Sequence, residues 1–383
     1  MTEQIEDIVI VGGGPAGAYL GWLLAQNGIS PIIFDHSYPR EKPCGGGISV
    51  LAIEKFSFLQ EIPDEKSPDN FFELVSPHGA SVMTTGEKST WSLSRQSLDR
   101  FILDKAINQG CRLITEQILD IKLINNIWHI KTTDRKYLAK LIIGADGVNS
   151  IVRKKILGPI PKTELGICYG CFAKSEKKEA TRVKFLEKKQ GYAWCFPRHD
   201  HLSIGVAVDF VNGKQVKELF NHFIHEHYPH IKIISYWGAL IPNVRDPKFF
   251  NQPCCGDNWI LIGDAAGHVD PSTGEGITYA LWGAELATQA LLEQNPRSFD
   301  NRWRKEYGSM LIESCKSRDL FYNPFILENT LRLASRSTTL STILNRLICN
   351  EIQQQNLMKE VVKELPKIGY EYILSKIQQQ VKM

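Results

Sequence analysis

Cys44 stands directly before Gly45, Gly46 and Gly47, and this pairing of one thiol with three glycines suggests chemistry more clearly than any other stretch. Three consecutive glycines cost backbone entropy on folding. Such a run is expected where the backbone needs positive φ angles, or where a flat, bulky group approaches the main chain closely. A cysteine thiol has a reference pKa of about 8.5, so it is protonated at neutral pH and can donate a proton. Which of these the stretch serves depends on what else the chain binds.

A strand-like stretch, Tyr-Ala-Trp-Cys-Phe-Pro, carries aromatic side chains at Tyr192, Trp194 and Phe196. Side chains alternate along a β-strand, so these three share one face while Ala193 and Cys195 share the other. Three rings on one face form a flat apolar wall that suits an apolar substrate. On periodicity alone, an ordinary sheet core explains the pattern better.

The first sixty residues show the order that a dinucleotide-binding fold requires: an apolar run ending at Val11, the motif Gly-Gly-Gly-Pro-Ala-Gly, and a helical pattern. This order gives a tight turn and a helix N-terminus that faces a pyrophosphate. A second apolar run ends at Asp35, 18 residues past Gly17. That spacing is close to the roughly 20 residues expected for an acid that hydrogen-bonds a ribose. We therefore predict dinucleotide contacts at Gly12, Gly14, Ala16, Gly17 and Asp35.

Two later strand ends carry an Asp-Gly and a Gly-Asp pair, and the second pair is followed by a Gly-x-Gly element and a long helical pattern. In these segments the chain resembles the FAD-dependent group that contains the aromatic hydroxylases and the geranylgeranyl reductases. In that group the Gly-Asp segment contacts the ribityl and phosphate part of FAD. The helix after it directs its N-terminus at the flavin, where it stabilises negative charge. The resemblance implies bound FAD, with contacts from Asp146, Gly263, Asp264, Gly274 and Gly276.

Arg95 opens a helical pattern that runs to about Asn108. The segment from Arg95 to Asp99 matches the Arg-x-x-Leu/Phe-Asp pattern of the same group. The resemblance implies that Arg95 contacts the flavin or a phosphate, and an exposed arginine at a helix start is the alternative.

The aromatic stretch, followed seven residues later by Gly-Val-Ala, resembles the Tyr-x-Trp-x-Phe-Pro and Gly-x-Gly signature of the geranylgeranyl reductases. Ala207 departs from it, because the signature has glycine there. The cysteine stretch fits the same family's Cys-x-Gly-Gly element, and the resemblance covers about residues 5–295. It implies an enzyme that saturates carbon–carbon double bonds of prenyl chains. The implied catalytic residues are Cys44, Gly46 and Gly47, and the implied substrate-binding residues are Tyr192, Trp194 and Phe196.

The chemistry of such a substrate agrees with this interpretation. An isolated trisubstituted alkene is not polarised, so hydride addition needs a proton delivered to one carbon while positive charge develops on its tertiary neighbour. This step needs a proton donor against the substrate and aromatic faces near the cation. Cys44 is the expected donor, and a structural or shielding cysteine is the alternative.

The expected fold is α/β, with a Rossmann-type FAD-binding domain, an antiparallel-sheet substrate domain and a helical C-terminal region. A three-stranded meander is expected over 116–143, and the only strong helix of the substrate domain over 214–227. The predicted FAD-binding domain is discontinuous and comprises 1–70, 95–160 and 252–300. The remaining boundaries are 71–94 and 161–251 for the substrate domain and 301–383 for the helical region.

Composition limits the other classes of function. The chain has 383 residues and a net charge of +3, too small to indicate nucleic acid. Residues 301–383 carry 13 Lys and Arg against 8 Asp and Glu, so this part suits an anionic membrane surface or a solvated helical face. Nine irregularly spaced cysteines and a polar N-terminus predict reduced thiols and a cytoplasmic location, with at most peripheral membrane contact. The lone Cys168-x-x-Cys171 predicts no metal site.

Two other classes of function stay open. The aromatic stretch also looks like the Trp-x-Trp-x-Ile-Pro element of flavin-dependent halogenases, so a monooxygenase or halogenase is the first alternative. An electron-transfer flavoprotein is the second, although an aromatic wall would have no purpose in it. There is no second Gly-x-Gly-x-x-Gly motif, so the electron donor is either transiently bound NAD(P)H or a ferredoxin-like protein.

Overall fold

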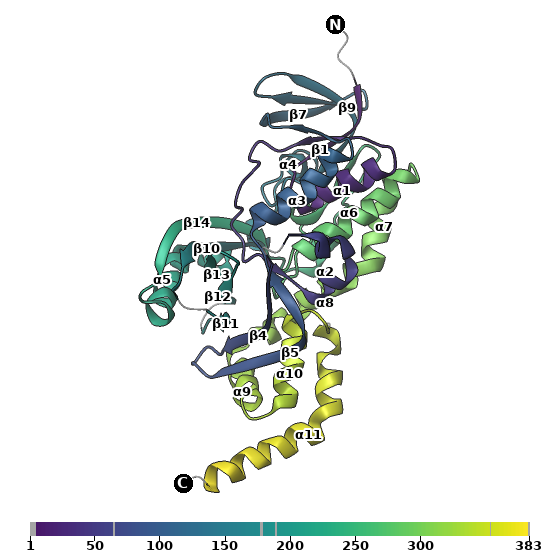
Figure 1. Ribbon diagram of the computed structural model, residues 1–383. Coiled ribbons are helices and arrows are strands. Elements are labelled where there is room, and N and C mark those ends of the chain that lie inside the picture. Colours follow the sequence, from purple (N-terminus) through teal and green to yellow (C-terminus); the bar gives the residue numbers. More distant parts are fainter. Residues whose placement is uncertain (1–4, 64–65, 177–178, 188–189, 353, 382–383) are drawn as a thin grey trace. The chain divides into compact units, whose positions relative to one another are not determined.

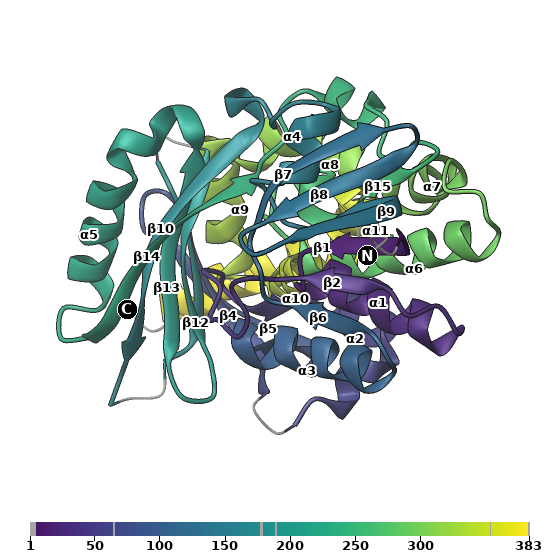
Figure 2. The same ribbon diagram turned by 90° about the horizontal axis from the view of Figure 1, so that it is seen from above.

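The computed structural model describes residues 5–63, 66–176, 179–187, 190–352 and 354–381. The chain divides into two compact units, each with its own sheet (Figures 1 and 2). Unit 1 comprises Met1–Lys42, Arg95–Leu165 and Ile241–Cys315, and unit 2 comprises Pro43–Ser94, Gly166–Leu240 and Lys316–Met383.

The sheet of unit 1 has the strand order β6-β2-β1-β9-β8-β7, with β15 also paired to β9. Five strands run parallel: β1 (Ile5–Val11), β2 (Ile32–Phe34), β6 (Arg112–Ile114), β9 (Lys136–Gly144) and β15 (Trp259–Leu261). The antiparallel strands β7 (Ile118–Ile124) and β8 (Ile127–Thr132) complete the predicted meander with β9. The C-terminal residues of β1 are fully apolar and buried, as expected for a parallel strand covered on both faces.

Helices α1 (Pro15–Gln26) and α6 (Ile277–Leu292) lie side by side against this sheet (Figure 2). Helix α3 (Arg95–Asn108) packs on α1. The bounds of α3 and α6 confirm those expected from the sequence. The other helical segments of unit 1 are α4 (Ile151–Ile156), η2 (Lys162–Glu164), η4 (Pro247–Asn251), η5 (Gly263–Ala265), α7 (Ser298–Trp303), the π-helical η6 (Arg304–Gly308) and the first half of α8 (Ser309–Phe321).

The sheet of unit 2 has the order β14-β10-β13-β12-β11-β4-β5-β3. Its strands are β3 (Gly47–Ile48), β4 (Ser67–Val75), β5 (Ser81–Ser92), β10 (Leu165–Lys174), β11 (Thr181–Phe185), β12 (Gly191–Pro197), β13 (Leu202–Asp209) and β14 (Lys232–Pro242). Strands β10, β13, β12 and β11 pair antiparallel in turn, as do β4, β5 and β3, which agrees with the prediction, whereas β11 and β4 are parallel. Ala207, the departure from the glycine signature, continues β13 in register with Tyr192.

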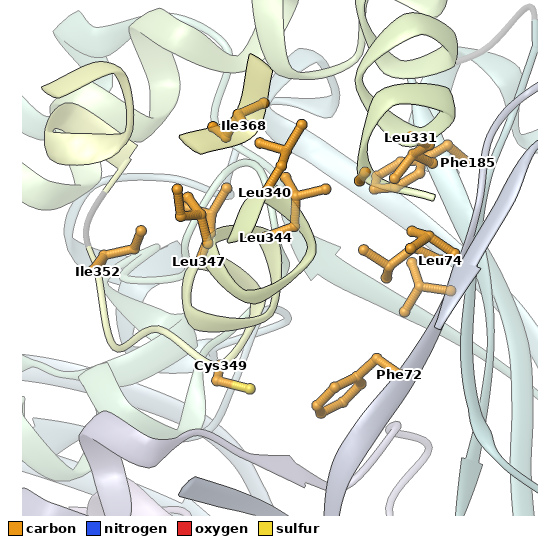
Figure 3. Packing of buried hydrophobic residues seen from close by; sticks show 14 of the residues in the cluster. Phe72, Leu74, Phe185, Leu331, Leu340, Leu344, Leu347, Cys349, Ile352 and Ile368 are labelled. Atoms are coloured by element: carbon orange, nitrogen blue, oxygen red, sulfur yellow. The ribbon is translucent and has the colours of Figure 1, made fainter. Parts of the chain in front are cut away.

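Two helical layers cover the sheet of unit 2. On one side, η3 (Phe210–Gln215) leads into α5 (Val216–His227), which packs on β13 (Figure 1). On the other side, α9 (Pro324–Ala334), α10 (Thr338–Ile348) and α11 (Gln354–Val381) form an apolar cluster with the strands. Figure 3 shows Phe72 and Leu74 of the sheet in this cluster with Leu340 and Leu344 of α10. The remaining helical segments are α2 (Val50–Lys55) and η1 (Ser57–Glu61).

The unit boundaries differ from the predicted domain boundaries at 43–70, 161–165, 241–251 and 301–315, and the rest of the predicted helical region, 316–383, belongs to unit 2. Residues 43–70, assigned to the FAD-binding domain from the sequence, fall in unit 2 because Gly47 and Ile48 pair with β5 and the Val50 N–H donates to the Cys349 carbonyl at 3.1 Å. Residues 301–315, assigned to the helical region, fall in unit 1, where Trp303 packs on His268 with ring centroids 4.3 Å apart. Nothing in the sequence of these two segments indicates which part of the chain they pack against.

Candidate functional site

The glycine turn after β1 is shaped by close approach of the backbone. Gly12 has φ +103°, and a Cβ there would lie 2.3 Å from the Ala145 carbonyl oxygen. A Cβ on Gly17 would lie 1.9 Å from the Gly12 oxygen. Gly14 differs, because the nearest atom to its Cβ position is an Asp99 oxygen at 4.0 Å. The turn is therefore tight on its inner side and open in front of Gly14.

Gly14 is also the N-cap of α1, with no side-chain cap and no acidic residue in the first turn. The first N–H groups of a helix need acceptors, and together with the helix dipole they attract an anion. Asp35 stands at the same turn, where its Oδ2 accepts a hydrogen bond from the Gly13 N–H at 2.9 Å. Its Oδ1 accepts from the Ser37 N–H at 2.9 Å and from the Ser37 hydroxyl at 2.7 Å.

Gly263 lies between α1 and α6, close to one alanine of each helix. It has φ +59°, and its Cβ position lies 3.3 Å from the Ala16 Cβ of α1 and 3.4 Å from the Ala280 Cβ of α6. The next residue, Asp264, lies 3.5 Å from the Lys42 Nζ. Predicted contact residues far apart in the sequence thus lie at one place in unit 1.

Helix α6 begins directly after Gly276 and, like α1, has no side-chain cap and no acid in its first turn. The Asp264 Oδ1 lies 3.2 Å from the Cβ position of Gly276. Gly274 turns the chain toward this helix start with φ +74°. The expected role of this helix N-terminus, to stabilise negative charge on the flavin, stays a prediction.

Arg95 is buried at the start of α3, where its Nε and Nη2 atoms bond the two carboxylate oxygens of Asp99, each at 2.9 Å. Glu41 caps the helix by accepting a hydrogen bond from the Arg95 N–H at 3.0 Å. Since Asp99 also faces Gly14, the pair borders the open side of the glycine turn. A direct contact from Arg95 to the flavin or a phosphate stays a prediction. No sequence signal pointed to Glu41.

Asp146 carries an unsatisfied buried atom. Its Oδ2 accepts a hydrogen bond from the Ile151 N–H at 2.6 Å, while its Oδ1 is buried without a hydrogen-bond partner among the described residues. Burial raises the pKa of this carboxyl group. The Asp146 Cα lies 2.9 Å from the Cβ position of Gly12, so the backbone of Asp146 lies against the glycine turn. A hydroxyl donor would satisfy the orphaned Oδ1, and FAD carries such hydroxyls on its ribityl chain and ribose.

Cys44, in unit 2, is a half-buried free thiol on a clamped loop. Its carbonyl oxygen accepts hydrogen bonds from the Arg198 Nη2 and the Ser203 hydroxyl, both at 2.7 Å. Its sulfur accepts from the Gly46 N–H at 3.3 Å. These bonds fix the backbone on either side of the thiol.

The glycines after Cys44 contact the protein itself. A Cβ on Gly45 would lie 2.7 Å from the Phe196 ring, and one on Gly47 would lie 3.2 Å from it. Gly46 has φ +81°, with the Leu93 oxygen 2.1 Å from its Cβ position. The flat group that the glycine run predicted is therefore, at Gly45 and Gly47, the Phe196 ring of the same unit. A seat for the flavin on this loop stays a prediction.

The aromatic wall is larger than the sequence indicated. Trp194 packs on Trp237 of β14 with ring centroids 5.9 Å apart, and Trp237 packs on Phe172 at 6.1 Å. Both indoles lie over glycines, since a Cβ on Gly205 would lie 2.5 Å from Trp194 and one on Gly170 would lie 2.4 Å from Trp237. Sequence reasoning missed Trp237 and Phe172. Two glycines on neighbouring strands were the available signal.

The two faces of β12 differ as predicted. Tyr192 and Trp194 pack together at 5.8 Å on the face of the wall, whereas Ala193 and Cys195 belong to the core under α5. Burial raises the pKa of the Cys195 thiol to about 12, so it stays protonated and inert. The indole N–H groups of Trp194 and Trp237 are buried and have no acceptor within the described ranges.

Comparison with known proteins gives the family. Residues 6–166 match a family model described as an FAD binding domain. The chain is 30% identical over 305 residues to the geranylgeranyl diphosphate reductase of Rhodobacter capsulatus, covering 75% of each chain. The chain belongs to the geranylgeranyl reductase family of FAD-dependent oxidoreductases. The digeranylgeranylglycerophospholipid reductase of Methanocaldococcus jannaschii is 24% identical over 357 residues, covering 83% of this chain and 87% of that protein.

Solved structures share the fold. A geranylgeranyl bacteriochlorophyll reductase-like protein from Thermoplasma acidophilum superimposes with a TM-score of 0.77 at 17% identity, covering 94% of this chain and all of that one. The flavin-dependent brominase Bmp2 gives 0.67 at 18% identity, with the same coverage. The family members use FAD, and the uncapped starts of α1 and α6 with the orphaned oxygen of Asp146 fit this cofactor in the present reductase.

Proposed function

We propose that this geranylgeranyl reductase family member saturates carbon–carbon double bonds of prenyl chains, with Cys44 as the proton donor. The observation that carries the proposal is the clamped Cys44 loop beside the indole of Trp194, whose Nε1 lies 3.6 Å from the Cβ position of Gly45. A thiol and an aromatic face are the two groups that protonation of an unpolarised alkene needs. The names of the relatives from R. capsulatus and M. jannaschii support the same substrate class.

FAD, when bound in its reduced form, supplies the hydride. We propose that it is held by residues of unit 1, namely Gly12, Gly14, Ala16, Gly17, Asp35, Arg95, Asp146, Gly263, Asp264, Gly274 and Gly276. The helix starts after Gly14 and Gly276 would face its anionic groups, and Asp35 and Asp146 would accept bonds from its hydroxyls.

The proton step uses residues of unit 2. Cys44 donates its thiol proton to the less substituted carbon, and positive charge develops on the tertiary carbon, where the hydride adds. The faces of Trp194 and Trp237 stabilise that charge. The thiolate left behind accepts the Gly46 N–H, a hydrogen bond that strengthens with negative charge on sulfur. A proton from water then restores the thiol, so the alkene gains one hydride and one proton.

The substrate in this proposal is long and apolar, and it is presented from a membrane or micelle. Tyr192, Trp194 and Phe196 contribute to its binding wall, and Trp237 and Phe172 extend that wall. Either NAD(P)H or a ferredoxin-like protein delivers electrons to the flavin.

A flavin-dependent halogenase or monooxygenase is the second candidate, because brominase Bmp2 shares the fold. The halogenase element has Trp and Ile where this chain has Tyr192 and Phe196. The clamped thiol also has no task in halogenation. Chloride- or bromide-dependent products, or a hydroxylated product formed with oxygen, would identify this class.

The test is anaerobic incubation of the dithionite-reduced holoenzyme with geranylgeranyl lipids in detergent, followed by mass spectrometry. A gain of two hydrogens per double bond is expected. Small aromatic acids should remain unchanged under the same conditions. Unchanged prenyl lipid, together with oxygen- or halide-dependent modification of an aromatic compound, would contradict the proposal.

A further inference from the structure

Helix α11 carries a row of exposed apolar side chains. Met358, Val362, Leu365, Ile373 and Ile377 are each more than half exposed, from 51% to 64%. Their spacing of three, four or eight residues places them along one stripe of α11, which continues on both sides of Pro366 inside the helix. Water-exposed apolar residues aligned over five turns are unlike the scattered ones of an ordinary surface.

This stripe is not the face that holds α11 to unit 2. Ile368 is buried in the cluster of Figure 3, and Leu357 and Val361 are partly buried against the same cluster. Glu371 accepts hydrogen bonds from the Thr339 N–H at 3.1 Å and the Thr339 hydroxyl at 2.9 Å, which ties α11 to the start of α10. The helix therefore has one packed apolar face and a second apolar face that points to solvent.

The charges of α11 are sorted between these faces. Among the side chains described in α11, the exposed charged residues are all lysines: Lys359, Lys363, Lys367 and Lys376. The acids are half-buried instead. Glu360 pairs with Arg346 of α10 at 3.3 Å, and Glu364 lies 4.0 Å from Lys363. The solvent side of α11 thus presents apolar residues and positive charge.

We propose that this face of α11 docks on a membrane surface that contains anionic lipids. A helix with an apolar stripe flanked by lysines lies in the headgroup region, with its stripe in the acyl boundary and its ammonium groups among the phosphates. A second copy of the chain fits less well, because antiparallel pairing of two α11 stripes would bring lysines together with no exposed acid on the helix to neutralise them. The inference rests on the proposed function in that a lipid substrate would be drawn from the same surface.

The experiment is flotation of the full-length holoenzyme with vesicles of phosphatidylcholine, with and without about one-third phosphatidylglycerol. The wild type should bind the anionic vesicles and release in high salt. Lys359→Gln with Lys363→Gln should weaken binding by roughly 25-fold, about fivefold for each lysine near an anionic surface. Val362→Ser with Ile373→Ser should abolish flotation with the anionic vesicles.

Matched controls come from exposed positions elsewhere in unit 2. Lys217→Gln with Lys232→Gln removes the same charge, and Val211→Ser with Ile234→Ser removes similar exposed apolar side chains. These controls should float like the wild type. If the α11 variants also float like the wild type, or if the wild type ignores anionic vesicles, the inference is overturned. A concentration-dependent dimer that the Val362 and Ile373 substitutions dissolve would overturn it as well.

Turnover separates this inference from the proposed function. The α11 variants should keep wild-type FAD content and wild-type reduction of a detergent-dispersed prenyl lipid, because α11 lies outside both predicted sites. A wild type that floats but reduces no prenyl lipid would contradict the proposed function and leave the docking surface standing. Loss of detergent-phase activity along with flotation would instead assign the effect to damaged folding and overturn the docking role.

Discussion

Both units contain a glycine run, and the two runs serve different purposes. At the turn after β1, Gly12 and Gly17 are crowded by backbone atoms, whereas the space before Gly14 is open. At the Cys44 loop, Gly45 and Gly47 are filled by the Phe196 ring and Gly46 by the Leu93 carbonyl. An identical residue type thus leaves open space at Gly14 in unit 1, where a ligand contact is predicted, and makes room for other parts of the protein in unit 2. A glycine run alone does not reveal whether a ligand or the protein occupies the space.

The largest effect is expected at the unit 1 turn, where two glycines can be compared directly. Gly14→Leu should fold, because the Cβ direction is open and φ is −72°, but its side chain should occupy the pyrophosphate position. Gly17→Leu should fail to fold, since no Cβ fits 1.9 Å from a carbonyl oxygen. The measurements are flavin absorbance and the melting temperature of the apoprotein. Full FAD content in Gly14→Leu would contradict a pyrophosphate site in front of Gly14.

The next effect concerns the thiol in unit 2. Cys44→Ser keeps the size of the side chain but replaces the thiol by a far weaker acid, so alkene reduction should fall roughly 10²-fold or more. FAD content should not change, because the predicted contacts to the phosphates and riboses of FAD are all in unit 1. Cys195→Ala is the matched control, since Cys195 lies on the opposite face of the sheet in the α5 core. Wild-type turnover by Cys44→Ser would remove the acid role and leave the loop with a structural one.

A third change tests why the unit 2 glycines are there. Gly45→Ala should lower the free energy of unfolding by about 2–3 kcal/mol, because its Cβ would lie 2.7 Å from the Phe196 ring. Phe196→Leu in the same chain should restore part of that loss by removing ring atoms, which a double-mutant cycle on chemical denaturation would measure. If the two substitutions lower the free energy of unfolding additively, the Phe196 ring is not the reason that position 45 requires glycine.

Much of unit 1 could be predicted from the sequence, because its signals are local. The strand, the glycine motif and the helix follow one another within thirty residues, and the bounds of α3 and α6 agree with the periodic pattern. The two faces of β12 could also be predicted, since side chains alternate strictly between the faces of a strand. These features depend on neighbours in the chain and on the fixed geometry of regular elements.

The remainder depends on long-range partners that the sequence does not name. Trp237 lies on β14, the edge strand of the sheet, and packs on Trp194 of β12. Arg198 donates a hydrogen bond to the carbonyl of Cys44, which is 154 residues away in the sequence. The parallel pairing of β11 with β4 was missed for the same reason, since strand alternation fixes a face but not a direction. The assignment of residues 43–70 to unit 2 follows from a two-residue strand, which is too short to leave a pattern.

The smallest expected effect concerns Asp35 at the glycine turn, where ligand binding can be separated from local structure. Asp35→Ala removes the predicted ribose acceptor and also leaves the Gly13 N–H without its 2.9 Å partner, so FAD affinity should fall by on the order of 1–3 kcal/mol. Asp35→Asn keeps one oxygen for the Gly13 N–H and should lose less. Ser37→Ala is the control, because its hydroxyl bonds only the other carboxylate oxygen of Asp35 at 2.7 Å. Titration of the apoproteins with FAD by flavin fluorescence measures the three affinities. Equal affinities in all three would mean that Asp35 holds the turn and never contacts the ribose.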